Sequence, residues 1–124
     1  MTASRFLHIN IRCTDVERTR NFYEQLIGLI VGERPPFQST GYWLYLGDEP
    51  LIHLVQRGPS ENAHDAAGNI DHIAFQGLDV EATRAALRDA GVPFREAVVP
   101  RDGTVQILVR DPDGIQVELS FDRA

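Results

Sequence analysis

The strongest constraint on the fold is an internal repeat at an offset of 64 residues. Superposing residues 8–20 on residues 72–84 gives seven identities in thirteen positions, where about one is expected by chance. The identical pairs are His8/His72, Ile9/Ile73, Asp15/Asp79, Val16/Val80, Glu17/Glu81, Thr19/Thr83 and Arg20/Arg84. A chain with this pattern must be built from two similar modules, each of which buries too little apolar surface alone.

Each module shows the same succession of hydrophobic periods, which predicts the order β-α-β-β-β. In residues 1–57 we expect strands at 6–12, 29–34, 42–46 and 51–56, with a hairpin turn at 47–50. In residues 70–124 we expect strands at 70–76, 92–99, 104–110 and 115–121. A Gly- and Ala-rich segment, 58–69, has neither period and is predicted to link the modules. The fold class is therefore α+β, a single domain of two βαβββ modules.

Helix boundaries follow from capping signals. Thr14 and Glu17 have the spacing of a capping box, and Gly28 is suited to end the first helix. Asp79 is expected to begin the second helix and Gly91 to end it.

Composition excludes several classes of function. The 124 residues include 43% apolar and 24% charged residues, with no apolar run long enough to span a membrane. A net charge of −6 argues against nucleic-acid binding and leaves a cationic ligand or a solvated acidic surface as alternatives. The single cysteine, Cys13, and the lack of a signal-like N-terminus favour a cytoplasmic protein.

Four metal-competent side chains occupy corresponding strands. In the first strand of the first module, Leu7, Ile9 and Ile11 form the apolar side that faces the helix, so His8 is expected on the opposite face. The same reasoning places His72 on the opposite face in the second module. His53 and Glu118 have the corresponding phase in the last strands, although Leu51 and Val55 weaken the assignment of His53. The fourth histidine, His64, lies in the predicted linker.

Three imidazoles and a carboxylate suit Zn²⁺, Ni²⁺, Co²⁺ or Fe²⁺ better than Ca²⁺ or Mg²⁺, which prefer oxygen donors. If only His8, His72 and Glu118 bind, they form a two-histidine, one-carboxylate face with open coordination positions. Arg12, Gln106 and Arg110 share the outward phase of their strands and could anchor an anionic group. Aromatic residues in the first hairpin, Trp43, Tyr42 and Tyr45, could line a pocket or serve packing alone.

Two segments resemble the vicinal oxygen chelate superfamily, the group of glyoxalases, bleomycin resistance proteins and extradiol dioxygenases. Residues 21–29 (NFYEQLIGL) look like the family's FYxxLLGL segment, and residues 110–119 (RDPDGIQVEL) look like its DPDGxxxEL segment. The resemblance covers nearly the whole chain. It implies a curved sheet around a metal cleft, a divalent metal (Zn, Ni, Co, Mn or Fe) at His8, His53, His72 and Glu118, a small-molecule substrate and a homodimer.

The resemblance leaves three activities open. A glyoxalase-like lyase or isomerase would work through a metal-stabilised enediolate, with Glu118 as the catalytic base and His53 as a ligand or proton shuttle. Glyoxalases commonly have Glu, and methylmalonyl-CoA epimerases Gln, where this chain has His53. An extradiol dioxygenase would hold Fe²⁺ with His8, His72 and Glu118 and use His53 as acid or base, but Leu108 replaces its tyrosine. A metal-free antibiotic-binding protein is the third alternative, although such members generally lack the metal set.

Overall fold

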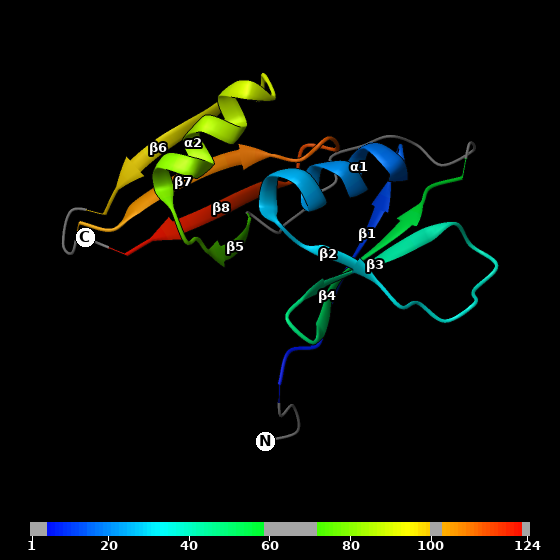
Figure 1. The fold of residues 1–124 in the computed structure, drawn as a ribbon. Coiled ribbons are helices and arrows are strands. Elements are labelled where there is room, and N and C mark those ends of the chain that lie inside the picture. The colour runs from blue at the N-terminus through cyan, green and yellow to red at the C-terminus, as the bar shows by residue number, and fades with distance from the viewer. Residues whose placement is uncertain (1–4, 59–71, 100–102, 123–124) are drawn as a thin grey trace. The chain divides into compact units, whose positions relative to one another are not determined.

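The computed structural model describes residues 5–58, 72–99 and 103–122 (Figure 1). The chain divides into two compact units, Met1–His64 and Asp65–Ala124. Apart from residue 58, the predicted linker lies outside the described residues, and so does His64.

The first unit has the predicted β-α-β-β-β order. Its elements are β1 (Ile9–Cys13), α1 (Val16–Phe22), the π-helical turn η1 (Tyr23–Ile27), β2 (Ile30–Gly32), β3 (Gly41–Leu46) and β4 (Glu49–Gln56). The strands form one sheet in the order β1-β4-β3-β2. The outer strand β1 pairs in parallel with β4, whereas β4, β3 and β2 pair antiparallel.

The second unit repeats this arrangement. Its elements are β5 (Ile73–Gln76), α2 (Val80–Asp89), β6 (Phe94–Val98), β7 (Val105–Arg110) and β8 (Gln116–Phe121). The strand order is β5-β8-β7-β6, with β5 parallel to β8 and the other pairs antiparallel. The two sheets have the same topology, which confirms the α+β class and the two βαβββ modules.

Both helices begin at the same aspartate of the repeat. The Asp15 carboxylate accepts the Arg18 backbone N–H at 3.2 Å, and Asp79 accepts that of Ala82 at 3.0 Å. The predicted cap at Thr14 was therefore one residue too early, because the carboxylate that follows it satisfies the free N–H of the first turn. Gly28 ends η1 with a φ of 89°, as expected for a left-handed cap.

Several strands are shorter than predicted. The first strand begins at Ile9, and Leu7, which was expected on the buried side, is 58% exposed because it precedes the ladder. Residues 29–34 supply only the three-residue strand β2, since Pro35 and Pro36 follow. By contrast, β4 includes Glu49 and Pro50, which narrows the hairpin turn to Gly47 and Asp48.

Each helix covers one face of its own sheet (Figure 1). The core of the first unit lies between α1 and its sheet, and its buried residues include Ile11, Val16, Phe22, Leu44, Ile52 and Leu54. The second unit buries Leu87 of α2 with Ile107, Val109, Val117, Leu119 and Phe121 of its sheet. No helix in the described parts of the chain is long and apolar enough to cross a membrane.

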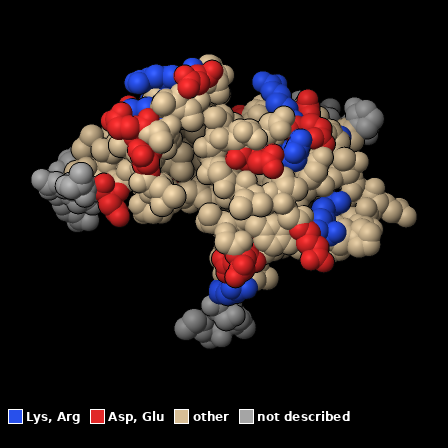
Figure 2. All heavy atoms as spheres, viewed as in Figure 1, with Lys and Arg blue, Asp and Glu red and all other residues tan. Residues whose placement is uncertain are grey.

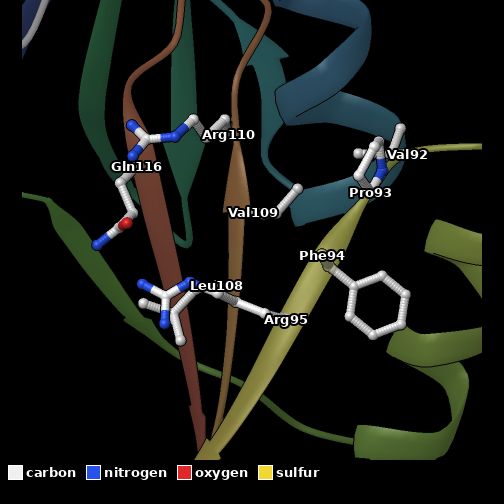
Figure 3. A pocket seen from close by; sticks show the side chains of 8 residues that line it. All are labelled: Val92, Pro93, Phe94, Arg95, Leu108, Val109, Arg110 and Gln116. Atoms are coloured by element: carbon white, nitrogen blue, oxygen red, sulfur yellow. The ribbon is translucent and has the colours of Figure 1, made fainter.

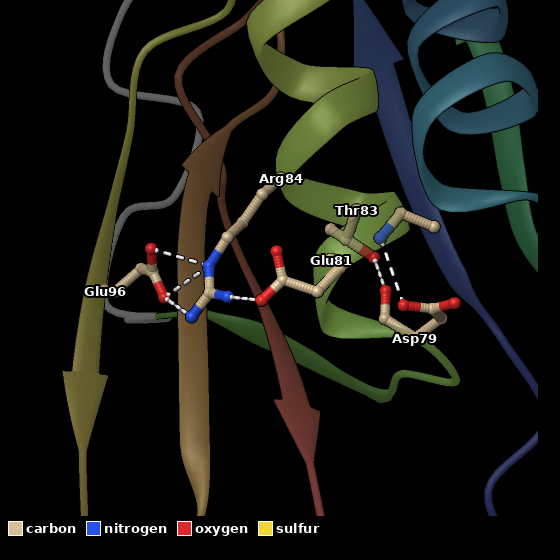
Figure 4. A network of polar contacts seen from close by, with 6 residues as sticks. Asp79, Glu81, Thr83, Arg84 and Glu96 are labelled. Atoms are coloured by element: carbon tan, nitrogen blue, oxygen red, sulfur yellow. Dashed lines mark hydrogen bonds and ion pairs between the residues drawn. The ribbon is translucent and has the colours of Figure 1, made fainter.

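An ion-pair network ties α2 to the edge strand β6 (Figure 4). Arg84 donates from Nη2 to Glu96 Oε1 at 2.7 Å and also contacts Glu81 within the helix. The hydrogen bond from Arg84 is the main reason that the pKa of Glu96 is lowered. Acidic and basic side chains lie close together over both helices in the view of Figure 2, so the helix surfaces carry mixed charge.

Candidate functional site

Alternation along the two last strands decides which face each candidate donor occupies. In β4, Ile52 and Leu54 are buried, and the less buried His53 points to the opposite face. In β8, Val117 and Leu119 are buried, and Glu118 points away from them. Each sheet therefore presents one metal-competent side chain of its last strand on the face that its helix does not cover.

In the first unit, His8 and His53 lie in direct contact. Their rings stack with centroids 3.8 Å apart and planes 10° apart. Trp43 stacks on His53 with a centroid distance of 4.0 Å and an angle of 11°. Trp43 is the cross-strand partner of His53 in the β3–β4 pair, so the sheet register brings these two rings together.

The imidazole of His53 has a lowered pKa and one buried ring nitrogen without a hydrogen-bond partner in the described structure. Burial lowers its pKa below the ordinary value of 6.5, and the charges of His8 and Arg34 act in the same direction, against a backbone hydrogen bond at Pro50. Its Nε2 is buried and has no hydrogen-bond partner in the described structure. A neutral imidazole with an unused ring nitrogen is the form that binds a metal ion or exchanges a proton with a ligand.

In the second unit, His72 and Glu118 are neighbours. Nε2 of His72 lies 3.7 Å from Oε1 of Glu118, whose side chain is only 13% exposed. Ser120 donates a hydrogen bond from Oγ to the other carboxylate oxygen at 3.0 Å. Ser120 was not predicted, although it lies two residues along the same strand and therefore on the same face.

The sheet register surrounds Glu118 with small or apolar neighbours. It lies opposite Ala74 of β5 and Leu108 of β7. The corresponding neighbours of His53 are Asn10 and Trp43. Leu108 thus occupies the position beside the carboxylate where the resemblance to ring-cleaving dioxygenases would require a tyrosine.

Each unit contributes two of the four predicted donors. Within neither unit do three or more His, Cys, Asp or Glu side chains of the described residues gather in a way that could hold a metal ion. The structure therefore brings His8 together with His53, and His72 together with Glu118. In chemical terms imidazole and carboxylate donors suit a divalent transition metal. Within the units, the buried Nε2 of His53 has no hydrogen-bond partner among the described residues, and the Glu118 carboxylate is held by Ser120.

A pocket of about 670 Å³ opens beside His53 in the first unit. It is lined by Arg5, Leu7, His8, Asn10, Arg34, Phe37, Ser39, Trp43, Asp48, Glu49, Pro50, His53, Leu54 and Val55. Arg34, Phe37 and Ser39 were not predicted as site residues, because the segment between β2 and β3 has no hydrophobic period that would fix its direction. Of the suspected aromatic residues, Trp43 lines the pocket.

A second pocket, of about 440 Å³, lies on the second unit between β6, β7 and the start of β8 (Figure 3). Arg95, Leu108, Arg110 and Gln116 line it from the sheet, whereas Phe94 points toward α2 (Figure 3). Arg110 was predicted as an outward-facing residue, and here it donates to the Gly114 carbonyl at 2.8 Å. Glu118 shares the sheet face of Leu108, its cross-strand partner.

Comparisons with known proteins agree on one family. The model of the Glyoxalase/Bleomycin resistance protein/Dioxygenase superfamily matches residues 5–119. A protein of Vibrio parahaemolyticus named "Probable lactoylglutathione lyase" is 33% identical over 128 positions, covering 96% of this chain and 91% of that protein. A lactoylglutathione lyase of Neisseria meningitidis serogroup A is 29% identical, covering 92% and 88%. The solved structure of a fosfomycin resistance protein of Listeria monocytogenes superposes with a TM-score of 0.77 at 18% identity, covering 98% and 96%, which shows a shared fold.

Proposed function

Because this chain belongs to the Glyoxalase/Bleomycin resistance protein/Dioxygenase superfamily, we propose that it is a divalent-metal-dependent enzyme of the glyoxalase type. It acts as a lyase or isomerase on a small substrate that presents two oxygen atoms to the metal. Relatives named as lactoylglutathione lyases support this activity over the others in the superfamily. We propose that the whole of residues 1–124 is one functional domain, active in the cytoplasm as a homodimer.

One observation supports the proposal: each unit has a pair of candidate donors at equivalent positions of the repeat. His8 and His53 are in contact in the first unit, and His72 and Glu118 are in contact in the second. A structural role alone does not account for the buried, unpartnered Nε2 of His53. We propose that His8, His53, His72 and Glu118 hold the metal, with Zn, Ni, Co, Mn or Fe as the candidates.

When bound, the metal would act as a Lewis acid that polarises the substrate oxygens and makes the adjacent C–H more acidic. Glu118 is the candidate general base for that proton. Its oxygen Oε2 accepts from Ser120 and would stay oriented, while Oε1, near His72, is the oxygen available to take up the proton. We propose His53 as a ligand or proton shuttle, because its buried Nε2 has no hydrogen-bond partner in the described structure.

The test is turnover of the hemithioacetal of methylglyoxal and glutathione by metal-loaded protein, with oxygen excluded. We expect activity that a chelator removes and added metal restores. Glu118→Gln and His72→Ala should each lower kcat/KM by about 10²-fold or more, because each loses a proton-transfer group or a metal ligand. His64→Ala removes the histidine outside the proposed set and should leave kcat/KM unchanged.

Two results would overturn this function. Cleavage of a catechol that depends on oxygen would assign the protein to the dioxygenases instead. Ligand binding that is unchanged in metal-free protein and in His72→Ala, with no turnover, would assign it to the metal-free binding proteins.

A further inference from the structure

Arg34 is fixed in an orientation that leaves one edge of its guanidinium group unused. Nη1 donates to the Ser39 carbonyl at 2.9 Å, and Nη2 donates to Ser39 Oγ at 3.0 Å. Nε is buried and has no hydrogen-bond partner. Ser39 therefore occupies the end of the guanidinium, and the side formed by Nε and Nη2 is the edge that pairs with a carboxylate in two parallel hydrogen bonds.

Neighbouring residues hold this arginine in place. The guanidinium carbon of Arg34 lies 5.1 Å from the centre of the Phe37 ring. A Cβ atom added at Gly41 would lie 3.1 Å from Arg34 Nη2 and 2.1 Å from the Leu54 carbonyl. Because Gly41 has no side chain, the Arg34 guanidinium has room to lie across the end of β3.

The charge of Arg34 is not neutralised by any carboxylate of the described residues. Arg5, the other arginine of the pocket, is paired with Glu49 at 2.8 Å. Asp48 also lines the pocket, but it lies beyond the opposite end of β3 from Arg34. Arg34 is beside Gly41 at the start of this strand, and the strand is roughly 17 Å long. One end of the pocket is therefore cationic and the other end is acidic.

Arg34, Trp43 and His53 line the same pocket. The charge of Arg34 reaches His53, since it is one of the causes that lower the pKa of that imidazole. Trp43 lies on β3, which pairs with β2 and β4, and its ring supplies a flat apolar wall. The centroids of the Trp43 and Phe37 rings are 6.4 Å apart. A ligand with its anionic group on Arg34 would lie along Trp43 with its other end toward His53.

We propose that this pocket binds a small carboxylate with a flat apolar body, whose acid group pairs with the free edge of Arg34 while its body packs against Trp43. Only one part of this inference rests on the proposed function, namely that the ligand belongs to the substrate class. Binding of the ligand itself needs no metal. One guanidinium edge matches one carboxylate, whereas a phosphate dianion would leave charge unpaired. Nε is buried, so binding requires a side chain near the guanidinium to move; we propose that this is Phe37, which is 55% exposed and whose ring centre lies 5.1 Å from the guanidinium carbon.

Trp43 is the chain's single tryptophan, so its fluorescence reports on this pocket directly. The experiment titrates the full-length protein with benzoate and with its neutral analogue benzamide, with and without excess EDTA. We expect a saturable change with benzoate that persists in EDTA, and at least about tenfold weaker binding of benzamide, because a hydrogen bond to a charged group is lost.

Variants separate Arg34 from general charge effects. Arg34→Gln should weaken benzoate binding by about tenfold or more and leave benzamide binding unchanged. Arg34→Lys keeps the charge but not the paired donors, so benzoate should bind with intermediate affinity. Arg18→Gln, on the exposed surface of α1, makes the same change in net charge and should have no effect.

The proposal is overturned if wild-type protein shows no saturable response, or binds benzoate and benzamide equally. It is also overturned if inorganic phosphate displaces benzoate at equal concentration, or if benzoate binds only without EDTA, which would place the acid on a metal. The wild-type comparison decides even if an Arg34 variant does not fold. Benzoate binding in EDTA without any turnover would instead retain this pocket and remove the proposed enzymatic function.

Discussion

Leu54 and Leu119 are equivalent residues of β4 and β8, and each is predicted to contribute strongly to the stability of its unit. Their exposed fractions are 0% and 5%, on the faces opposite His53 and Glu118. Replacing a buried leucine by alanine removes three carbons, which costs about 2.4 kcal/mol of transfer free energy. The cavity left behind brings the expected total to about 2–5 kcal/mol for each variant.

Leu78→Ala is the matched control, because it makes the same chemical change at a side chain that is 101% exposed. Urea unfolding followed by far-UV circular dichroism should show a loss of about 2–5 kcal/mol for Leu54→Ala and Leu119→Ala. Leu78→Ala should remain within about 0.5 kcal/mol of wild type. A total stability of about 5–15 kcal/mol is typical, so both core variants should still fold.

The result also tests the site, because strand alternation links the two faces. If Leu54→Ala cost less than about 0.5 kcal/mol, the buried face of β4 would be misassigned, and His53 would point toward α1 instead of into the pocket. The same outcome for Leu119→Ala would place Glu118 against α2. Either result would refute the assignment of both donors to the uncovered faces.

Four further predictions concern His53, Asp79 and Gly41. In an NMR titration His53 should titrate below 6.5, and His8→Ala should raise its pKa because both the burial and the neighbouring charge are reduced; an unchanged pKa would contradict this. Since folding lowers this pKa, the unfolded chain binds the proton more tightly, so His53 should reduce stability as the pH falls below 6.5, an effect absent in His53→Gln. Asp79→Ala should cost about 0.5–2 kcal/mol in urea unfolding, and Asp79→Asn less, because asparagine can still cap α2; equal losses would argue against the cap. Gly41→Ala should cost about 1–3 kcal/mol, since the new Cβ would meet the Leu54 carbonyl at 2.1 Å, and a neutral effect would show that the two strands separate easily there.

The repeat made most of the fold predictable. Because the same hydrophobic pattern occurs twice, each module supported the other, and the order of helices and strands along the chain followed. The order of the strands within each sheet was not predicted. Boundaries were less predictable, because they depend on which group satisfies a free backbone N–H. Asp15 caps α1 although Thr14 had the better-known sequence spacing.

The candidate site was predictable only in part. Strand phase was enough to place His53 and Glu118 on the uncovered faces, because alternation is a local property of a strand. The stacking of Trp43 on His53 depends on register between strands, and the orientation of Arg34 depends on an irregular segment and on the space at Gly41. Neither feature has a periodic signal in the sequence.

The central claim is the proposal that His8, His53, His72 and Glu118 are ligands of a divalent metal ion. Elemental analysis of the metal-to-chain ratio tests it most directly, after the full-length protein is loaded with Zn²⁺ or Co²⁺ and dialysed. We predict about one ion per chain for wild type and for His64→Ala, and a ratio near zero for His8→Ala, His72→Ala and Glu118→Ala, because each loses a ligand. A wild-type ratio near zero, or a ratio that these three substitutions leave unchanged, would contradict the account.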